Sequence, residues 1–277
     1  MSPTWLITGC STGLGRALAE AALDHGLNVV VTARDKAKVQ DLADAHPASA
    51  LALSLDVTDP AQVTAAVAEA NERFGAVDVL VNNAGYGYRA AVEEGDDADV
   101  QQLFATNFHG PVAMIKAVLP GMRERRSGAI VNISSIGARI SPAGSGYYSA
   151  VKAALEAMTA SLRKEVEPLG ITAMIVEPGA FRTDFAGRSL AQSAEAIADY
   201  ADTAGRRRKE NDTTDGTQEG DPAKAALALI AAVESAAPPL MLVLGPDALS
   251  NFRGAMAALA ADLDAWEPTS VGTSFSA

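Results

Sequence analysis

The stretch WLITGCSTGLGRALAE, Trp5 to Glu20, decides the fold. Four residues typical of a strand lead into a turn that holds Gly9, Gly13 and Gly15, and a run of Leu and Ala typical of a helix follows. Such a turn gathers free backbone N–H groups and the positive end of the helix dipole at one point, which suits a phosphate group. The glycine spacing is GxxxGxG and not the more common GxGxxG, so a plain strand-to-helix turn stays open as the alternative. If a dinucleotide binds, we expect Gly9 to permit the sharp turn, Gly13 to admit the pyrophosphate, and Gly15 to let the helix pack on the strand.

Strand-like and helix-like stretches alternate along the chain. Seven runs are rich in β-branched residues and apolar on both faces, which is typical of parallel strands covered by helices on both sides. They lie at Trp5–Thr8, Asn28–Ala33, Leu51–Asp56, Val77–Asn82, Ala129–Ser134, Ile171–Val176 and Leu240–Leu244. The first helical stretch carries apolar residues at spacings of three and four and ends at the expected C-cap Gly26. The sequence therefore predicts the α/β class, with a doubly wound parallel sheet.

Composition limits the possible functions. The chain has 277 residues, 48% of them apolar, and a formal net charge of −12, so it can bury a core and repels nucleic acid and anionic lipid. A single cysteine, Cys10, excludes an internal disulfide, and the three histidines lack the spacing of metal ligands. The N-terminus resembles no secretion signal and no apolar run is long enough to span a membrane. We therefore expect a cytoplasmic protein without a bound metal.

A long polar interval runs from Arg182 to Gly220 between the sixth strand and a helix predicted at Pro222 to Ser235. Loops of this length in a compact domain are usually functional lids or are disordered. We find no break in composition that would mark a second domain, so we expect a single domain over residues 1–277 with a substrate-binding lid at about 182–220. Within the lid, the basic run Arg206–Lys209 is interpreted as a solvated face, with a clamp for an anionic substrate as the alternative.

The end of the second predicted strand indicates which cofactor binds. NAD-binding proteins place a carboxylate there, about 20 residues after the glycine turn, to bind the ribose hydroxyls. Here the position holds Ala33, and Arg34 follows. A missing carboxylate beside a guanidinium suits a 2′-phosphate, so NADP(H) is expected in preference to NAD(H). The alternative is that Arg34 is a solvated residue paired with Asp35.

Two further strand ends fall at the same expected edge of the sheet. Asp56 and Val57 follow the third strand, where they can bond and pack against an adenine. The fourth strand ends in NNAG, Asn82 to Gly85, a turn of small residues on which a ligand can lie. Three strand ends thus indicate one binding crevice.

The segment YYSAVK predicts an acid–base pair. Tyr148 and Lys152 are four residues apart at the start of a helix and share one face, whereas Tyr147 is five residues from the lysine. An ammonium near a phenol favours the phenolate, which makes tyrosine usable in acid–base chemistry. A structural pair on a helix surface is the alternative. Thirteen residues before Tyr148, a predicted strand ends in Ser134 and Ser135, at the sheet edge where ligands bind or as ordinary turn residues.

Taken together, these segments resemble the short-chain dehydrogenase/reductase family in its single-domain form, from about residue 4 to residue 245. The matching motifs, in the family's order and spacing, are TGCSTGLG, NNAG, Asn107 in ATNFHG, Ser135, Tyr148 with Lys152, and EPGAFRT. The resemblance implies a Rossmann-type sheet with strand order 3-2-1-4-5-6-7 and reversible hydride transfer between a nicotinamide cofactor and a carbinol or carbonyl carbon.

The resemblance also implies a role for each site residue. Tyr148 would be the general acid/base, Lys152 would bind the nicotinamide ribose and lower the Tyr148 pKa, and Ser135 would hold the substrate oxygen. Asn107 would stabilise a helix distortion and take part in the proton relay. The cofactor would lie against Gly9, Ser11, Thr12, Gly13, Leu14, Gly15, Arg34, Asp56, Val57, Asn83, Ala84, Gly85, Tyr148, Lys152, Pro178, Gly179, Phe181 and Thr183.

Within the family, TGCSTGLG, TARD and NNAGYG resemble the 17β-hydroxysteroid and retinoid dehydrogenase branch, which implies a bulky lipophilic alcohol or ketone as substrate. Alternatives are a 3-oxoacyl-thioester reductase and a nucleotide-sensing regulatory module without turnover. The family is commonly dimeric or tetrameric, so a homo-oligomer without nucleic-acid or membrane partners is expected. Several residues near the expected site either line an apolar substrate pocket or belong to the core: Tyr86, Tyr88, Ile140, Phe181 and Phe185.

Overall fold

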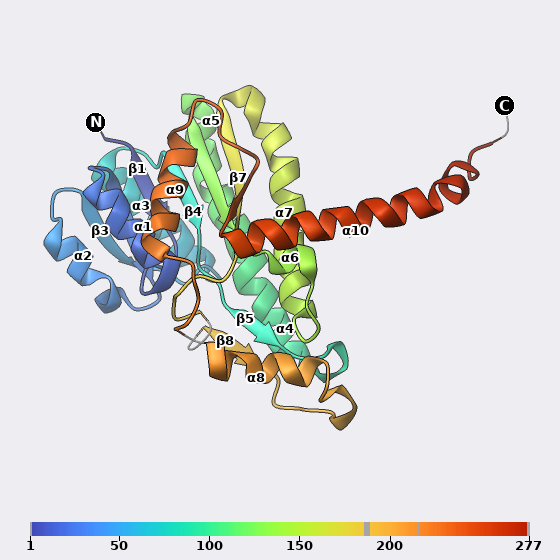
Figure 1. Ribbon diagram of the computed structural model, residues 1–277. Coiled ribbons are helices and arrows are strands. Elements are labelled where there is room, and N and C mark those ends of the chain that lie inside the picture. Colours follow the sequence, from blue (N-terminus) through green and yellow to red (C-terminus); the bar gives the residue numbers. More distant parts are fainter. Residues whose placement is uncertain (1, 186–188, 215, 276–277) are drawn as a thin grey trace.

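A parallel sheet of seven strands forms the centre of the computed structural model, which describes residues 2–185, 189–214 and 216–275 (Figure 1). Its order is β3-β2-β1-β4-β6-β7-β9. The strands are β1 (Thr4–Ile7), β2 (Asn28–Ala33), β3 (Ala50–Ser54), β4 (Val79–Asn82), β6 (Gly128–Ile133), β7 (Ile171–Pro178) and β9 (Met241–Leu244). Counted within this sheet alone, the order is 3-2-1-4-5-6-7, so the predicted fold is confirmed and each strand lies within about two residues of its predicted position.

The strand order reverses between β1 and β4, and this reversal positions the site. Ile7 of β1 pairs with Val31 of β2 on one side and with Val81 of β4 on the other. Because all three strands run in the same direction, the loops that follow them leave the sheet at one edge, on either side of the reversal. Open α/β sheets bind ligands in the crevice at this point.

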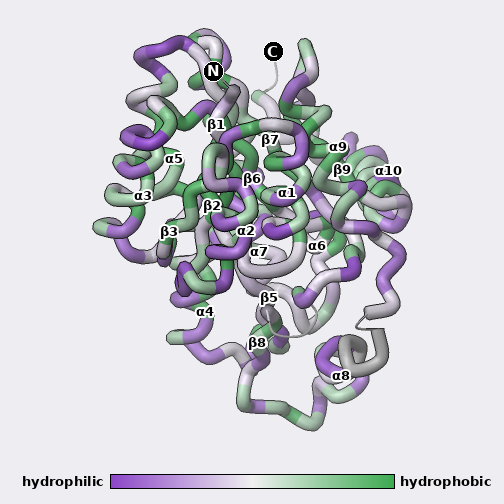
Figure 2. Tube along the Cα trace, turned by 90° about the vertical axis from the view of Figure 1, so that its left-hand side faces the viewer, coloured by the Kyte–Doolittle hydropathy of each residue, from purple (hydrophilic) through white to green (hydrophobic). Residues whose placement is uncertain are grey.

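Helices cover both faces of the sheet. One face packs against α1 (Gly13–Asp24), α2 (Gln40–Ala45) and α9 (Pro222–Glu234), and the other against α3 (Pro60–Phe74), α5 (Gly110–Arg125) and α7 (Gly146–Val166). Along β1, Trp5 and Ile7 enter the first core and Leu6 enters the second. The strands are therefore apolar on both faces, and in Figure 2 they form hydrophobic segments between the helical layers. No helix in the described part of the chain combines the length and apolarity needed to cross a membrane.

The remaining helices lie at the site end of the sheet or beyond it. They are α4 (Asp97–Phe104), a π-helix (Ala105–His109), α6 (Gly137–Ile140), α8 (Ala204–Thr214) and α10 (Pro246–Val271), with short 3₁₀ turns at Lys36–Lys38, Val92–Glu94 and Ala198–Tyr200. A further 3₁₀ turn, Glu167–Leu169, lies at the opposite end of the sheet, before β7. Sequence analysis made no prediction for α10, which extends away from the body of the molecule towards the C-terminus (Figure 1). From Met256 onwards every described residue of this helix is exposed.

The polar interval 182–220 contains regular structure that its sequence did not predict. Strand β8 (Leu190–Gln192) pairs in parallel with β5 (Gly87–Arg89) to form a second, two-stranded sheet. Helix α8 follows, and Arg208 holds it by an ion pair of 2.6 Å with the buried Glu94. A tertiary contact between segments far apart in the sequence therefore gives this interval its structure.

A buried ion cluster joins α6, α7 and β7 beneath the site. Arg139 donates from Nε to Glu177 at 2.9 Å, and its Nη2 forms an ion pair of 2.5 Å with Glu156. Ser134 donates from its hydroxyl to the other oxygen of Glu156 at 2.5 Å. Burial and the neighbouring charge of Glu156 raise the pKa of Glu177 to about 7, and Arg139 offsets part of this rise. One guanidinium thus faces two carboxyl groups, and the pair favours one bound proton.

This cluster predicts a pH-dependent contribution to stability. The pKa of Glu177 is raised in the folded chain, so its contribution is fully present below the ordinary glutamate pKa of 4.5 and is lost as the pH rises through about 7. Glu177→Gln removes that dependence while it keeps the acceptor for Arg139. We expect the Tm of the variant, relative to the unaltered chain, to rise by a few degrees between about pH 5 and about pH 8.

Thermal unfolding monitored by circular dichroism across this pH range checks the expectation. Glu124→Gln, at an exposed position on α5, is the matched control and should leave the pH dependence unchanged. A Tm difference for Glu177→Gln that stays constant with pH would contradict the assignment of a shared proton to the cluster.

Candidate active site

The glycine turn after β1 has the features of an anion site. Gly9 and Gly13 adopt φ values of +73° and +65°, in the region that glycine enters without strain. Thr12, the N-cap of α1, makes no side-chain cap hydrogen bond, and the first turn of the helix carries no acidic residue. The N–H groups at the start of α1 are therefore not used by a side-chain cap, and the positive end of the helix dipole lies beside them. A phosphate group fits this cradle.

The NNAG loop after β4 packs directly against the glycine turn. The side-chain amide of Asn83 donates to the carbonyl oxygens of Thr8 at 2.9 Å and Gly9 at 3.0 Å. A Cβ on Gly15 would lie 2.2 Å from that amide nitrogen, and a Cβ on Gly9 would lie 2.9 Å from Ala84 Cα. The close approach of the glycine turn to the NNAG loop therefore requires glycine at positions 9 and 15. Gly15 contributes to this packing and does not line the cavity.

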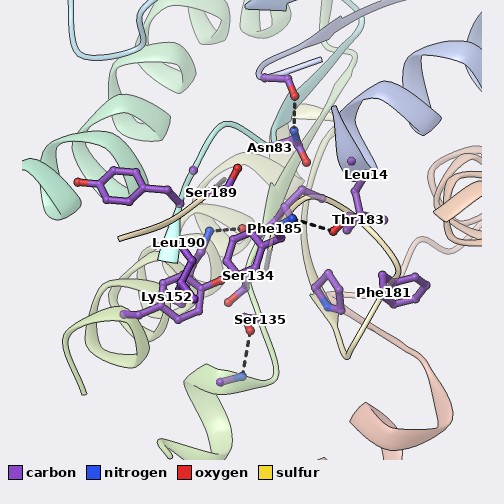
Figure 3. Close-up of a pocket in the computed structure, with 18 of the residues that line it drawn as sticks. Leu14, Asn83, Ser134, Ser135, Lys152, Phe181, Thr183, Phe185, Ser189 and Leu190 are labelled. Atoms are coloured by element: carbon purple, nitrogen blue, oxygen red, sulfur yellow. Dashed lines mark hydrogen bonds between the residues drawn. The ribbon is translucent and has the colours of Figure 1, made fainter. Parts of the chain in front are cut away.

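One cavity of about 1010 Å³ runs from the glycine turn to the end of β6. This volume is at the upper end of the roughly 300–1,000 Å³ of small-molecule sites. Seventeen of the eighteen residues that sequence analysis assigned to the cofactor line it, and Gly15 is the exception. Figure 3 shows how they converge from separate loops, with Leu14, Asn83 and Thr183 at one end and Ser135 and Lys152 at the other.

The loops after β2 and β3 form the end of the cavity that the sequence predicts to take an adenosine. Arg34 is exposed, lines the cavity, and forms no ion pair with Asp35 among the described residues. The Asp35 carboxylate instead accepts the Ala37 N–H at 3.1 Å and caps a short 3₁₀ turn. Asp56 accepts from the backbone N–H and hydroxyl of Thr58 at 2.9 and 2.7 Å. The guanidinium of Arg34 is thus placed to meet an anion at the open end of the cavity.

The loop after β7 lines the part of the cavity that the resemblance assigns to the nicotinamide. Pro178, Gly179 and Phe181 line it, and the Ala180 N–H donates to Asp247 at the start of α10 at 2.8 Å. Thr183 packs over the glycine turn, since a Cβ on Gly13 would lie 3.4 Å from the Thr183 Cβ. This loop therefore crosses the cavity and approaches the start of α1.

Tyr148 and Lys152 lie on the first turns of α7, inside the cavity and buried. The Lys152 Nζ donates to the Ile133 carbonyl at 2.8 Å and lies 5.9 Å from the centre of the Tyr148 ring. Tyr147 donates its hydroxyl to the Val92 carbonyl at 2.6 Å, outside the cavity. The geometry thus separates the two adjacent tyrosines and places Tyr148 with the lysine.

Burial is the largest influence on the pKa values of Tyr148 and Lys152. It raises the pKa of Tyr148 to about 12, and the Ser135 hydroxyl and the charge of Arg89 offset part of the rise. Burial also lowers the pKa of Lys152 to about 8, against the opposing influence of Glu156. Ser135 and Arg89 act to lower the pKa of Tyr148, and the same role for Lys152, which the resemblance implies, stays a prediction. Tyr148 therefore holds its proton at neutral pH and can act as an acid.

Asn107 lies in the π-helix and is completely buried. Its side-chain amide donates to the carbonyl oxygens of Leu103 at 3.0 Å and Tyr86 at 3.3 Å, which sustains the widened helical turn. A Cβ on Gly85 would lie 2.5 Å from Asn107 Oδ1 and 3.6 Å from Lys152 Nζ. Asn107 does not line the main cavity but lies behind Gly85, near the lysine.

Apolar side chains line the part of the cavity that is expected to take the substrate. Tyr86, Ile140, Phe181 and Phe185 line it, and the Phe185 ring lies 5.8 Å from that of Tyr148, whereas Tyr88 belongs to the core.

The arginines of the basic run Arg206–Lys209 have different surroundings. Arg207 lines the cavity, Arg208 is held by Glu94, and Arg206 is 3.5 Å from Asp202 on the surface. The interpretation of this run as a solvated face is therefore wrong for Arg207 and Arg208.

Several residues that line the cavity were not predicted from the sequence, and two of them are polar side chains on elements that were not predicted either. Arg89 on β5 lines it and donates to the Ser145 hydroxyl at 2.5 Å, and Asn251 lines it from α10. Strand β5 is only three residues long, so period-2 alternation could not reveal it. The start of α10 carries a readable signal, because Gly245 and Pro246 mark a helix N-terminus.

Comparisons with known proteins agree with this geometry. The family model described as short chain dehydrogenase matches residues 3–194. The chain is 36% identical over 244 residues to a 3-ketodihydrosphingosine reductase from Bacteroides thetaiotaomicron, covering 87% of each chain. The crystal structure of a short-chain dehydrogenase from Streptomyces avermitilis superimposes with a TM-score of 0.93 at 44% identity, over 99% of this chain and 98% of that one. A 3-ketoacyl-(acyl-carrier-protein) reductase from Brucella melitensis, solved with NADH, gives 0.74 at 26% identity over 87% of this chain and 96% of that one.

The family model covers more than half of the chain, and the cavity is lined by residues from most of the motifs on which the resemblance rested, whereas Gly15 and Asn107 lie behind its wall. The chain belongs to the short-chain dehydrogenase family of oxidoreductases.

Proposed function

We propose that the protein is an NADP(H)-dependent oxidoreductase that interconverts a secondary alcohol and a ketone, or a primary alcohol and an aldehyde. The observation that carries the proposal is a single cavity that joins an uncapped helix N-terminus to Ser135, Tyr148 and Lys152. A phosphate cradle and an acid–base pair in one cavity suit a redox dinucleotide and its substrate.

The cradle fits the dinucleotide, because the glycine turn leaves backbone N–H groups for the pyrophosphate. Gly9 and Gly13 would hold the pyrophosphate, Arg34 a 2′-phosphate, and Lys152 the hydroxyls of the nicotinamide ribose. Pro178 would flank the nicotinamide. When bound, this cofactor supplies or accepts a hydride.

The chain's own residues would manage the proton and the developing charge. In reduction, the Ser135 hydroxyl would donate to the carbonyl oxygen, on which negative charge grows as hydride arrives. Tyr148 holds its proton at neutral pH and would transfer it to that oxygen. Lys152 would return a proton to Tyr148, and Asn107, which lies beside Gly85 as the lysine does, would hold a water that passes protons from solvent to the lysine. In oxidation the same steps run in reverse.

The substrate we propose is bulky and lipophilic. Aromatic and aliphatic side chains line the cavity near Tyr148, and the lid at about 182–220 of a single-domain chain would cover them. A relative named as a 3-ketodihydrosphingosine reductase supports a long-chain ketone, and one named as a 3-ketoacyl-(acyl-carrier-protein) reductase supports the acyl-thioester alternative. We further propose a cytoplasmic homodimer or homotetramer without nucleic-acid partners. A nucleotide-sensing module is the second candidate, and the complete acid–base set argues against it.

Replacement of Tyr148, the proposed proton donor, tests whether the protein is an enzyme. Tyr148→Phe removes the proton donor but keeps the buried ring, so turnover should fall by about 100-fold or more while NADPH binding is retained. Tyr147→Phe is the matched control, since its hydroxyl bonds Val92 outside the cavity, and it should keep full turnover. NADPH oxidation is followed with a panel of steroid, quinone, aliphatic-ketone and acyl-thioester substrates, and NADPH binding by fluorescence. Unchanged turnover in Tyr148→Phe would refute the mechanism, and NADPH binding without turnover on any substrate would favour the sensing module.

Replacement of Arg34 tests the cofactor choice. A charge-assisted pair with a 2′-phosphate contributes roughly 1.5–3 kcal/mol, so Arg34→Ala should raise the KM for NADPH about 10-fold or more. The KM for NADH should change little, because NADH carries no 2′-phosphate. Lys36→Ala, in the next turn and outside the cavity, controls for loss of general positive charge. Equal changes for both cofactors in Arg34→Ala would show that the residue does not recognise the phosphate.

A further inference from the structure

Helix α10 carries an apolar stripe with a regular spacing. The helix has 26 residues and is about 39 Å long at 1.5 Å per residue. Its large apolar side chains recur at intervals of three, four, three, four and three residues: Leu249, Phe252, Met256, Leu259, Leu263 and Trp266. A mean interval near 3.5 residues is typical of a seam between two helices. We call these six residues the α10 stripe.

The described part of the chain covers only the start of this stripe in part and leaves the rest exposed. Ala248 is the only buried residue that α10 contributes among the described residues, and the helix meets the body only near its start. Phe252 lies under the Arg139 guanidinium at 5.5 Å. Exposure then rises along the helix, from 44% at Met256 to 66% at Trp266. Isolated amphipathic helices gain most of their stability from a partner surface, so an uncovered stripe of this length indicates that one exists.

We propose that α10 is a dimerisation arm, whose stripe pairs with the α10 stripe of a second copy of this chain in antiparallel orientation. The first support is the order of the intervals, which is the same in both directions. An antiparallel pair centred between residues 257 and 258 therefore brings every stripe residue against another: Leu249 opposite Trp266, Phe252 opposite Leu263, and Met256 opposite Leu259. The register is self-complementary, which a two-fold dimer interface requires.

The charges along the arm support the same orientation. Arg253 lies in the first half of the helix, and Asp262, Asp264 and Glu267 lie in the second half. Antiparallel pairing about residues 257 and 258 places Arg253 beside the acidic half of the other copy. Parallel pairing would place the acidic halves side by side, and like charges at that spacing repel.

The α10 stripe is better suited to a second copy of the chain than to a membrane surface. Helices that bind lipid surfaces carry Lys and Arg on their polar face. The exposed half of α10 instead carries acidic residues, in a chain with a net charge of −12, and would be repelled by anionic lipid. A stable interface buries roughly 800 Å² on each partner. Two arms that overlap along their length supply part of this area, and each tip reaches the body of the other copy near α6, which adds to it.

The mass of the assembly tests the proposal, with variants matched in charge and helix spacing. Leu259→Glu with Leu263→Glu places two charges in the stripe, and Ala257→Glu with Ala261→Glu places two charges on the opposite face. We expect the stripe variant to halve the number of subunits measured by light scattering after size exclusion, while the control keeps the mass of the unaltered chain. The Tm in dilute solution should change little, because Leu259 and Leu263 are 53% and 63% exposed in the subunit. An unchanged mass for the stripe variant, or equal losses in both variants, would overturn the proposal.

Disulfide trapping tests the orientation. Cys10 is buried, and burial raises its pKa to about 12, so it does not compete. In the antiparallel register Phe252→Cys meets Leu263→Cys of the other copy, whereas two copies of the same position lie about 16 Å apart along the axis, beyond the roughly 7 Å that a disulfide allows. The double variant should therefore form a covalent dimer under mild oxidation, and each single variant should not.

Trapping of a single variant would overturn the antiparallel register, and absence of trapping in the double variant would overturn the pairing. Binding of the unaltered chain to phosphatidylcholine–phosphatidylserine vesicles through the stripe, with no effect of the stripe variant on mass, would assign the stripe to a membrane and also overturn the proposal.

Discussion

The close contact between the loops after β1 and β4 is the constraint on which the site depends. The Asn83 amide bridges two carbonyl groups of the glycine turn, and Gly15 leaves the space in which that amide lies. If either loop moved outwards, the N–H groups at the start of α1 would no longer face the same cavity as Tyr148. The sheet makes this contact possible, because β1 and β4 pair in register and their loops leave at one edge.

At the other end of the cavity, burial is the main influence on the pKa values of Tyr148 and Lys152. Tyr148 keeps its proton and Lys152 loses part of its affinity for one, since both lie in the interior. Arg139 and Glu156 hold the helices beneath them, and Ser134 ties this cluster to the end of β6. The acid–base residues are therefore positioned by packing and buried hydrogen bonds, and little of their geometry depends on exposed loops.

Local patterns in the sequence were enough to predict the sheet and many of the residues that line the cavity. The seven strands were recognisable because both faces are buried, and residues such as Arg34 and Ser135 were placed because they follow strand ends. The parts that were missed depend on contacts between distant segments. Strand β8 forms because it pairs with β5. Arg208 is held by the carboxylate of Glu94, which lies more than 100 residues earlier in the chain. The α10 stripe is visible in the sequence as a regular spacing of apolar residues, but it lies outside the motifs that predicted the site.

The central claim is that one cavity holds a nicotinamide and a carbonyl close enough for direct hydride transfer. The most direct test uses two preparations of NADPH, each deuterated on one face of the nicotinamide C4, with the carbonyl substrate that turns over fastest. Our account predicts that only one preparation delivers deuterium to the product carbon, without loss to solvent, because the cavity fixes one face of the ring towards the substrate. Deuterium delivered from both preparations, or solvent hydrogen at that carbon, would contradict it.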